Sequence, residues 1–216
     1  MSDKSLNLTQ ELFTVTRNQK EQLNGHRSFV LWLTSLSASG KSTIARQVEE
    51  RLYSEGLRTI ILDGDNTRIG INKDLDFTAK GREENLRRVA EISNLMNSAG
   101  VVVIASFISP FIEDRAKACS IIGMSSFIEV FVDAPLKVCV ERDPKGLYRK
   151  ALDGEIENFT GVSSPYEAPL RPDIHLKTDE FSPQDSVNSI CSWLAANSFI
   201  PVKEISKVPA DIGQGK

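Results

Sequence analysis

The chain has 216 residues, 40% of them hydrophobic and 25% charged, which is enough for one substantial core or two small ones. A net charge of −3 and a pI near 5.6 give no electrostatic reason to expect binding to duplex nucleic acid or to an anionic membrane. The three cysteines lack CxxC spacing and the two histidines stand far apart, so we expect a reducing compartment and no zinc site. No apolar run is long enough to cross a bilayer and the first residues lack a signal-peptide core, which favours a cytoplasmic location.

Strand-like and helix-like segments alternate along most of the chain. Residues 1–25 form a polar lead-in that we expect to be helical in part, around residues 10–24. In chain order we then predict a strand at residues 29–34, a helix at 41–54, a strand at 59–62, a helix at 82–99, strands at 101–106 and 127–132, a short strand at 174–176, and a helix that begins after Ser182. We expect one α/β domain over residues 26–201 and a frayed tail over residues 202–216.

The spacing of apolar residues indicates how these segments pack. In the first helix Ile44, Val48 and Leu52 recur at i, i+4 and i+8, and they give the helix one buried face. The predicted strands are too continuously apolar to leave one face in water. The alternation therefore predicts an α/β fold with a parallel sheet of about five strands and helices on both faces.

The segment between the first strand and the first helix has the features of a phosphate-binding loop. Backbone N–H groups and the positive end of the helix dipole would hold nucleotide phosphates there. Lys41 would reach the β- and γ-phosphate oxygens of ATP, and the Ser42 hydroxyl would ligate Mg²⁺. The residues expected to bind ATP are Ser35, Leu36, Ser37, Ala38, Ser39, Gly40, Lys41, Ser42 and Thr43. The predicted sheet is thus of the P-loop kinase type.

The first position of this loop departs from the Walker A pattern, which has glycine where this chain has Ser35. Glycine there lets the backbone turn tightly beside the phosphates. A serine must find an allowed backbone conformation or bear strain of about 1–3 kcal/mol. We therefore expect a functional but weakened ATP site.

Two carboxylates follow the second predicted strand, at the edge of a parallel sheet where ligands bind. Asp63 and Asp65 flank a glycine, and near a nucleotide they could hold Mg²⁺ through water or accept a proton from an attacking hydroxyl. The alternative is an Asx turn, which suits the DGDN segment. The adjacent phosphate loop favours the catalytic interpretation.

Basic side chains occur at two further places. Arg82 and Asn85 are three residues apart and share one helix face, and with Arg68 they could bind an anionic substrate, although spacing alone favours a solvated helix surface. Residues 142–150 form a basic loop that could close over the nucleotide, or could be an ordinary exposed loop.

Six collinear segments identify a family. GDNTR, NKDLDF, FISP, RDPKGLY, ENFTGV and PYEAP occur around the phosphate loop in the order and spacing of adenylylsulfate kinases, and the resemblance runs from about His26 to Glu180. It implies ATP-dependent phosphorylation of the 3′-hydroxyl of adenosine 5′-phosphosulfate, giving 3′-phosphoadenylyl sulfate in sulfate assimilation. It also implies Mg²⁺ and a homodimer, and a sulfate adenylyltransferase is a further candidate partner.

The resemblance also implies roles for individual residues. The candidate catalytic residues are Asp63 as the general base, Lys41, and Ser109, which matches a serine described as a phosphoserine intermediate; alternatively Ser109 caps the next helix. The residues that match substrate-binding positions are Asp65, Arg68, Phe77, Arg82, Asn85, Ile108 and Phe159. Among these, Phe77 and Phe159 match the pair that sandwiches the substrate adenine, and Asp65 joins Ser42 as a candidate Mg²⁺ residue. Arg142 and Lys145 match lid residues.

Four positions depart from the family pattern, namely Ser35, Asp76, Gly81 and Ile112. Asp76 replaces a usual glycine, and Gly81 stands where an aspartate commonly precedes Arg82. Two other interpretations therefore stay open. The chain could be another small P-loop kinase, acting on a sugar or a nucleoside, or a degenerate nucleotide-binding regulatory subunit with little activity.

Overall fold

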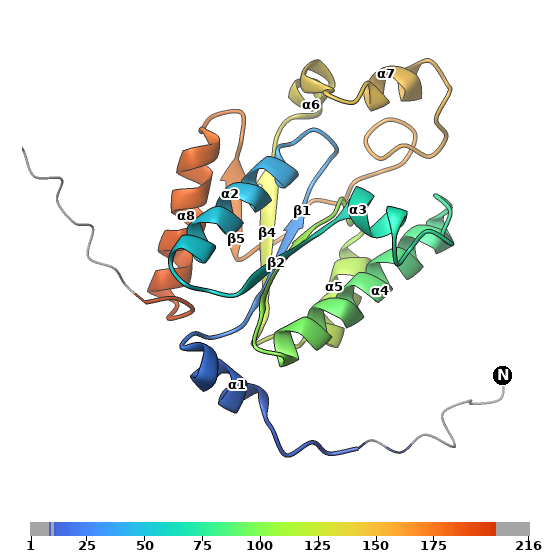
Figure 1. Cartoon of the computed structure of the whole chain (residues 1–216). Helices are drawn as coiled ribbons and strands as arrows, with labels where there is room; N and C mark the ends of the chain where they lie inside the picture. The colour runs from blue at the N-terminus through green and yellow to red at the C-terminus, as the bar shows by residue number, and fades with distance from the viewer. Residues whose placement is uncertain (1–8, 10, 202–216) are drawn as a thin grey trace, which may run out of the picture.

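Five strands form one parallel sheet at the centre of the computed structural model, which describes residue 9 and residues 11–201 (Figure 1). The strands are β1 (Val30–Thr34), β2 (Thr59–Asp63), β3 (Val102–Ser106), β4 (Phe127–Asp133) and β5 (Ile174–Lys177), in the order β2-β3-β1-β4-β5. Every neighbouring pair is parallel. The predicted fold class is confirmed, and each predicted strand agrees with the observed one to within one residue at either end.

The described residues form eight helices, in two layers beside the sheet and in short segments at its edges (Figure 1). They are α1 (Arg17–Asn24), α2 (Lys41–Ser54), α3 (Gly64–Ile69), α4 (Ala79–Ser98), α5 (Ile112–Ile122), α6 (Leu136–Arg142), α7 (Leu147–Leu152) and α8 (Pro183–Ala196). None of them is long and apolar enough to traverse a lipid bilayer.

The core has two halves because side chains of a buried strand alternate between the two faces of the sheet. Leu31 and Leu33 of β1 pack with α2 and α8 on one face. Val30 and Trp32 pack with α4 and α5 on the other. All four side chains are fully buried, so helices cover both faces of the central strand.

The helices expected from the sequence are present, with one shifted start. The α4 helix begins at Ala79 instead of residue 82, because the Thr78 side chain caps it by accepting a hydrogen bond from the Gly81 N–H. The lead-in contains α1, but the helix is shorter than expected: it begins at Arg17 after its cap Thr16, and residues 11–16 are not helical. Residue 10 and the tail at residues 202–216 lie outside the described residues.

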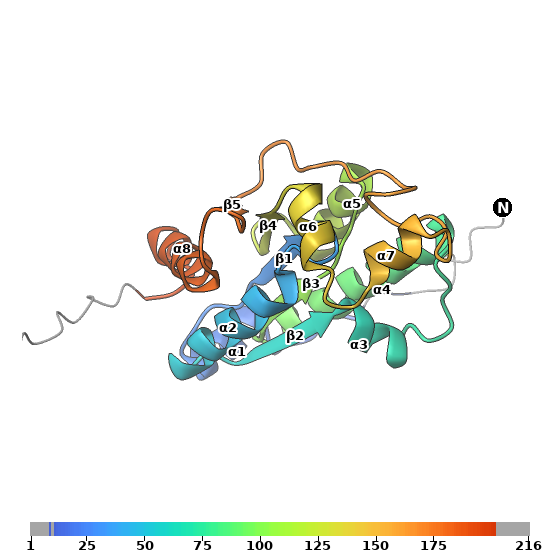
Figure 2. The same cartoon turned by 90° about the horizontal axis from the view of Figure 1, so that it is seen from above.

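Four helices were not predicted. The α3 and α7 helices have six residues each and α6 has seven, which is too short for a clear apolar period. The α5 helix follows Phe111, which has no capping side chain. The predicted basic loop at residues 142–150 in fact contains the end of α6 and the start of α7. Both helices lie above the carboxyl ends of the strands, where the site residues also gather (Figure 2).

Candidate active site

The phosphate loop joins the end of β1 to the start of α2, with Gly40 at φ 105° as the residue before the helix. No side chain caps α2, so its first N–H groups are available to an anion. Lys41 Nζ folds back over the loop and donates to the Leu36 and Ser35 carbonyl oxygens at 2.5 and 3.3 Å. Burial lowers the pKa of Lys41 to about 8. A bound phosphate would replace these carbonyls as the partner of the ammonium group.

Of the two alternatives for Ser35, an allowed backbone conformation or strain, the structure does not show strain at this residue. It is buried, and it is absent from the described non-glycine residues with positive φ. Ala38 has φ 59° instead, a left-handed conformation that favours glycine. The conformational strain of this loop therefore lies at the third residue after Ser35, and the serine itself is accommodated.

The two carboxylates after β2 lie beside the loop, as the sequence predicted. The Ser42 hydroxyl donates to Asp63 Oδ2 at 2.9 Å, and the Asp65 N–H donates to Asp63 Oδ1 at 3.0 Å. Asp63 thus caps α3, which confirms the Asx turn, and it also contacts Ser42 at the start of α2. The Asp65 carboxylate forms an ion pair with Lys145 from the segment between α6 and α7.

Arg82 connects the two segments that carry the predicted aromatic pair. Its Nε donates to the Phe77 carbonyl oxygen at 2.9 Å, its Nη2 to the Asn158 carbonyl oxygen at 2.8 Å, and its Nη1 to Thr160 Oγ1 at 3.2 Å. One guanidinium group therefore joins the main chain of Phe77 to the residues that flank Phe159. Phe77 is 65% exposed, whereas Phe159 is 8% exposed and meets the Tyr148 ring edge-on at 5.0 Å.

Arg68 lies next to this pair, with its guanidinium 4.3 Å from the centre of the Phe77 ring. It donates to the Asp76 carbonyl oxygen at 3.1 Å. Among the described ion pairs none involves Arg68 or Arg82, and partial burial lowers the pKa of both groups. Two positive charges without carboxylate partners favour an anionic ligand.

Asn85 lies one turn beyond Arg82 on α4 and is 5% exposed. Its Oδ1 accepts a hydrogen bond from Asn72 Nδ2 at 2.9 Å. The predicted solvated helix surface is therefore wrong for this residue. Asn72 is a buried polar neighbour that no sequence pattern indicated.

Ile108 and Ser109 follow β3 at the same edge of the sheet. Ser109 is 2% exposed with φ 39°, and its Oγ accepts a hydrogen bond from Trp32 Nε1 at 3.2 Å. The Ile108 carbonyl oxygen accepts from Thr34 Oγ1 at 2.8 Å. Ser109 does not cap the next helix, because α5 begins at Ile112 with Phe111 as the preceding residue.

Arg142 lies against the phosphate loop, where its Nη1 donates to the Ser39 carbonyl oxygen at 3.3 Å. Its Nη2 donates to the Thr178 carbonyl oxygen at 2.6 Å, and Thr178 Oγ1 donates to the same Ser39 oxygen at 2.8 Å. The Tyr148 hydroxyl donates to the Ser37 carbonyl oxygen at 3.1 Å. Sequence reasoning missed Thr178 and Tyr148; Thr178 directly follows β5, so its position after a strand was a usable signal.

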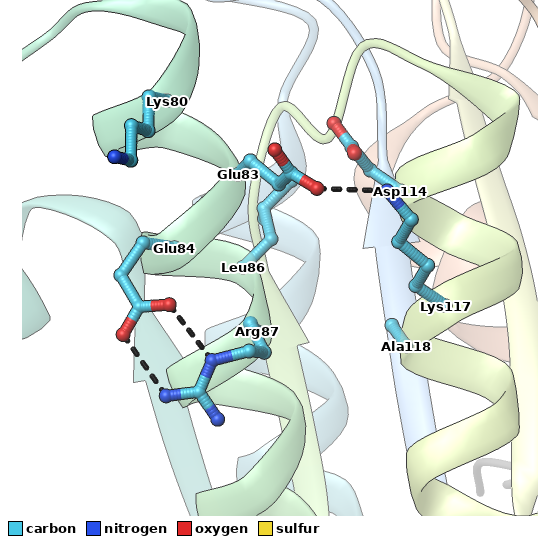
Figure 3. A pocket seen from close by; sticks show the side chains of 8 residues that line it. All are labelled: Lys80, Glu83, Glu84, Leu86, Arg87, Asp114, Lys117 and Ala118. Atoms are coloured by element: carbon cyan, nitrogen blue, oxygen red, sulfur yellow. Dashed lines mark hydrogen bonds and ion pairs between the residues drawn. The ribbon is translucent and has the colours of Figure 1, made fainter. Parts of the chain in front are cut away.

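A separate cleft of about 270 Å³ lies between α4 and α5 (Figure 3). Its walls include Lys117, which is 2.7 Å from Glu83 Oε1, and Arg87, which is 2.7 Å from Glu84 Oε2. No predicted site residue lines it, and four of its charged residues form ion pairs with one another. The predicted site residues gather instead at the carboxyl ends of the strands, which is the candidate active site.

Comparisons with known proteins identify the family of this chain. The family model described as adenylylsulphate kinase matches residues 27–177. An adenylyl-sulfate kinase from Thermodesulfovibrio yellowstonii is 48% identical over 194 residues, which cover 90% of this chain and 97% of that protein. The bifunctional enzyme NodQ of a Rhizobium species is 50% identical over 188 residues, but these cover 29% of NodQ and 87% of this chain.

A solved structure, that of the Mycobacterium tuberculosis APS kinase CysC in complex with AMPPNP and APS, superposes with a TM-score of 0.75. It is 43% identical, and the match covers 78% of this chain and 98% of that one. The family match spans most of the chain, and the T. yellowstonii kinase is covered almost completely. The chain belongs to the adenylyl-sulfate kinase family.

Proposed function

We propose that this chain transfers the γ-phosphoryl group of ATP to the 3′-hydroxyl of adenosine 5′-phosphosulfate, giving 3′-phosphoadenylyl sulfate in sulfate assimilation. The observation that carries this proposal is the Arg82 bridge, which holds Phe77 and the Phe159 segment around unpaired positive charge. A nucleotide with an anionic tail needs both an aromatic clamp and cations. The family membership and the resemblance of the CysC complex, which contains AMPPNP and APS, support the same substrates.

The donor half of the site suits the phosphates of ATP. Free N–H groups at the start of α2 and the Lys41 ammonium would bind the β- and γ-phosphoryl oxygens. Arg142 is already fixed at the Ser39 carbonyl and would lie beside the nucleotide. The ion pair between Lys145 and Asp65 holds the segment between α6 and α7 near the phosphates, where it can help to exclude water.

The residues present fit a magnesium ion. Ser42 Oγ is a hard oxygen donor that would bind the ion directly, and the Asp63 carboxylate, 2.9 Å from it, would attract the ion through water. The described residues contain no cluster of three or more acidic, histidine or cysteine side chains that could bind a metal alone, so phosphate oxygens and water would complete the coordination. When bound, Mg²⁺ neutralises charge on the phosphates. Asp65 would not bind the magnesium ion directly, because its carboxylate already forms an ion pair with Lys145.

The chemical step follows from the position of Asp63. Asp63 Oδ2, which accepts a hydrogen bond from the Ser42 hydroxyl in this structure, is the oxygen that would accept the proton of the 3′-hydroxyl. The 3′-oxygen then forms a bond to the γ-phosphorus, the bond from that phosphorus to the β–γ bridging oxygen breaks, and ADP leaves. Lys41 stabilises the charge on the transferred group. Ser109 contributes to the site through its backbone and not through its hydroxyl. The hydroxyl is buried and accepts a hydrogen bond from the Trp32 indole, and direct phosphoryl transfer requires no covalent step.

A coupled assay tests the proposal. Purified chain with MgATP should release ADP and form 3′-phosphoadenylyl sulfate when adenosine 5′-phosphosulfate is added. Asp63→Asn keeps the size of the side chain but removes its basicity, and it should lower turnover at saturating substrate by about 10²–10⁴-fold. Turnover of this variant within threefold of wild type would overturn the role of Asp63.

The same assay separates the alternatives. Turnover with a sugar or a nucleoside but not with adenosine 5′-phosphosulfate would indicate another small P-loop kinase. Binding of adenosine 5′-phosphosulfate without turnover would indicate a degenerate regulatory subunit.

We expect three further properties of this protein, which concern its oligomeric state, its location and a partner. A homodimer and an association with a sulfate adenylyltransferase are inferred from the family resemblance, and a cytoplasmic location is inferred from the sequence patterns given above. An enzyme that transfers an adenylyl group to sulfate must supply the substrate in any case. The similarity of this chain to 29% of the bifunctional NodQ fits an arrangement in which the kinase works beside a second activity.

A further inference from the structure

The turn that precedes α4 contains two residues that compete for one space, Asp76 and Gly81. A Cβ atom on Gly81 would lie 2.2 Å from Asp76 Oδ1 and 2.6 Å from the Asp76 carbonyl oxygen. Contacts below 3.0 Å are essentially never found around real Cβ atoms. Gly81 is buried and has no positive φ, so space and not backbone conformation requires glycine here.

Asp76 uses that space to organise the turn. Its Oδ1 accepts hydrogen bonds from the Thr78 N–H at 3.1 Å and from Thr78 Oγ1 at 2.6 Å. Thr78 Oγ1 in turn accepts from the Gly81 N–H at 3.1 Å, which caps α4. The hydrogen bonds of Thr78 also hold the pKa of Asp76 below its usual range, so the carboxylate stays ionised at neutral pH.

The same turn carries the substrate-binding groups. The Asp76 carbonyl oxygen, which a Cβ on Gly81 would displace, accepts a hydrogen bond from Arg68 Nη1. Arg68 lies over the Phe77 ring, and the Phe77 carbonyl oxygen accepts a hydrogen bond from Arg82 Nε. A shift of the main chain at residue 76 would therefore move Arg68, Phe77 and the Arg82 contact together.

We propose that Asp76 and Gly81 form a matched pair of positioning residues, in which the missing side chain at 81 admits the Asp76 turn that sets Phe77 and Arg68 for the acceptor nucleotide. The two departures from the family pattern then compensate each other. Asp76 supplies the carboxylate that organises the turn, and Gly81 lacks the side chain that would collide with Asp76. This inference rests on the proposed function for the identity of the acceptor.

Single and double substitutions test the pairing. Gly81→Ala is expected to raise the KM for adenosine 5′-phosphosulfate at least fivefold, since a displaced base–aromatic stack loses about that much affinity or more. The KM for ATP should stay within twofold. The melting temperature should fall, although glycine to alanine inside a helix ordinarily raises stability. Lys80→Ala, an exposed neighbour in the same helical turn, should leave all three quantities unchanged.

Changes at residue 76 distinguish pairing from general damage. In the Gly81→Ala background, Asp76→Gly should recover most of the lost KM and melting temperature, because glycine removes the carboxylate and lets the carbonyl turn away. Asp76→Asn keeps an oxygen in the same place and should recover neither.

Three results would overturn the inference. They are additive effects of Gly81→Ala and Asp76→Gly, equal rescue by Asp76→Asn, and a Gly81→Ala protein that behaves as wild type. The melting-temperature cycle needs no substrate, so it decides the pairing even if the wild-type chain fails to phosphorylate adenosine 5′-phosphosulfate and the proposed function is wrong.

Discussion

Individual side chains of the acceptor site are held mainly by main-chain oxygen atoms. Arg82 donates to two carbonyl oxygens and one hydroxyl, and Arg68 donates to carbonyl oxygens of residues 75 and 76. Carbonyl partners fix the direction of a guanidinium group but leave its positive charge uncompensated. The site can therefore be ordered before the substrate arrives and still attract its phosphosulfate group.

The aromatic pair gives a prediction at this scale, because its members differ in burial. Phe77→Ala should weaken binding of adenosine 5′-phosphosulfate at least fivefold and leave the melting temperature unchanged, since the ring is 65% exposed and a base–aromatic stack is worth about 1–3 kcal/mol. Phe159→Ala should weaken binding and also destabilise the fold by about 3 kcal/mol, because this ring packs on Tyr148.

Calorimetry of substrate binding and thermal unfolding check both variants. Tyr53→Ala, at an exposed position on α2, is the control for loss of an aromatic ring. A large fall in melting temperature for Phe77→Ala with unchanged affinity would assign that residue to the core.

At the scale of elements, α5 is connected to the loop after β3 by hydrogen bonds of one buried residue, Arg115. Its Nε donates to Glu129 Oε1 of β4 at 2.8 Å, and its Nη1 donates to the Ser109 carbonyl oxygen at 2.8 Å. Its Nη2 donates to the Glu167 carbonyl oxygen at 2.8 Å. One guanidinium group thus joins a helix, a strand and two loops, and it helps to hold Ser109 in its positive-φ conformation.

Arg115→Met should destabilise the protein by about 3 kcal/mol, because it removes one partner of a buried ion pair and leaves Glu129 without its cation. Denaturant unfolding measures this. Lys117→Met on the same helix breaks an exposed pair with Glu83 and should change stability by less than about 1 kcal/mol. Similar losses for the two variants would contradict the structural role of Arg115.

At the scale of the whole molecule, all four parallel pairings direct strand ends to one edge, where the phosphate loop, Asp63 and Ser109 meet. Placing Lys41 at this edge has a cost for the fold, because the ammonium group is buried before a nucleotide binds. Burial lowers its pKa from 10.5 to about 8. The unfolded chain therefore binds more protons than the folded one between these two values, and stability rises with pH in that window.

Lys41→Met should consequently make the nucleotide-free protein more stable at pH 7, by at most about 3 kcal/mol, while it abolishes turnover. The gain should shrink as the pH rises from 8 to 10.5, since the wild-type lysine loses its charge there. Denaturant unfolding of both proteins across this range measures the difference. A gain that does not depend on pH would show that packing, and not the buried charge, is responsible.

Much of this architecture follows from local sequence patterns. Apolar runs located every strand to within a residue, and the order strand, small-residue loop, helix located the phosphate loop. Asp63 was predictable because it directly follows a buried strand. These signals are readable without a structure because backbone conformation and burial at each position depend mostly on neighbours in the chain.

Other features depend on contacts between residues far apart in the chain, and only the tertiary structure decided them. The strand order β2-β3-β1-β4-β5 and the contact of Arg142 with Ser39, 103 positions earlier, have no local signature. The burial of Phe159 beside an exposed Phe77 was equally invisible, since both are phenylalanines in polar segments. Asp76 and Gly81 looked like two separate departures in the sequence, and they became one pair because the turn before α4 places a carboxylate where a side chain would otherwise begin.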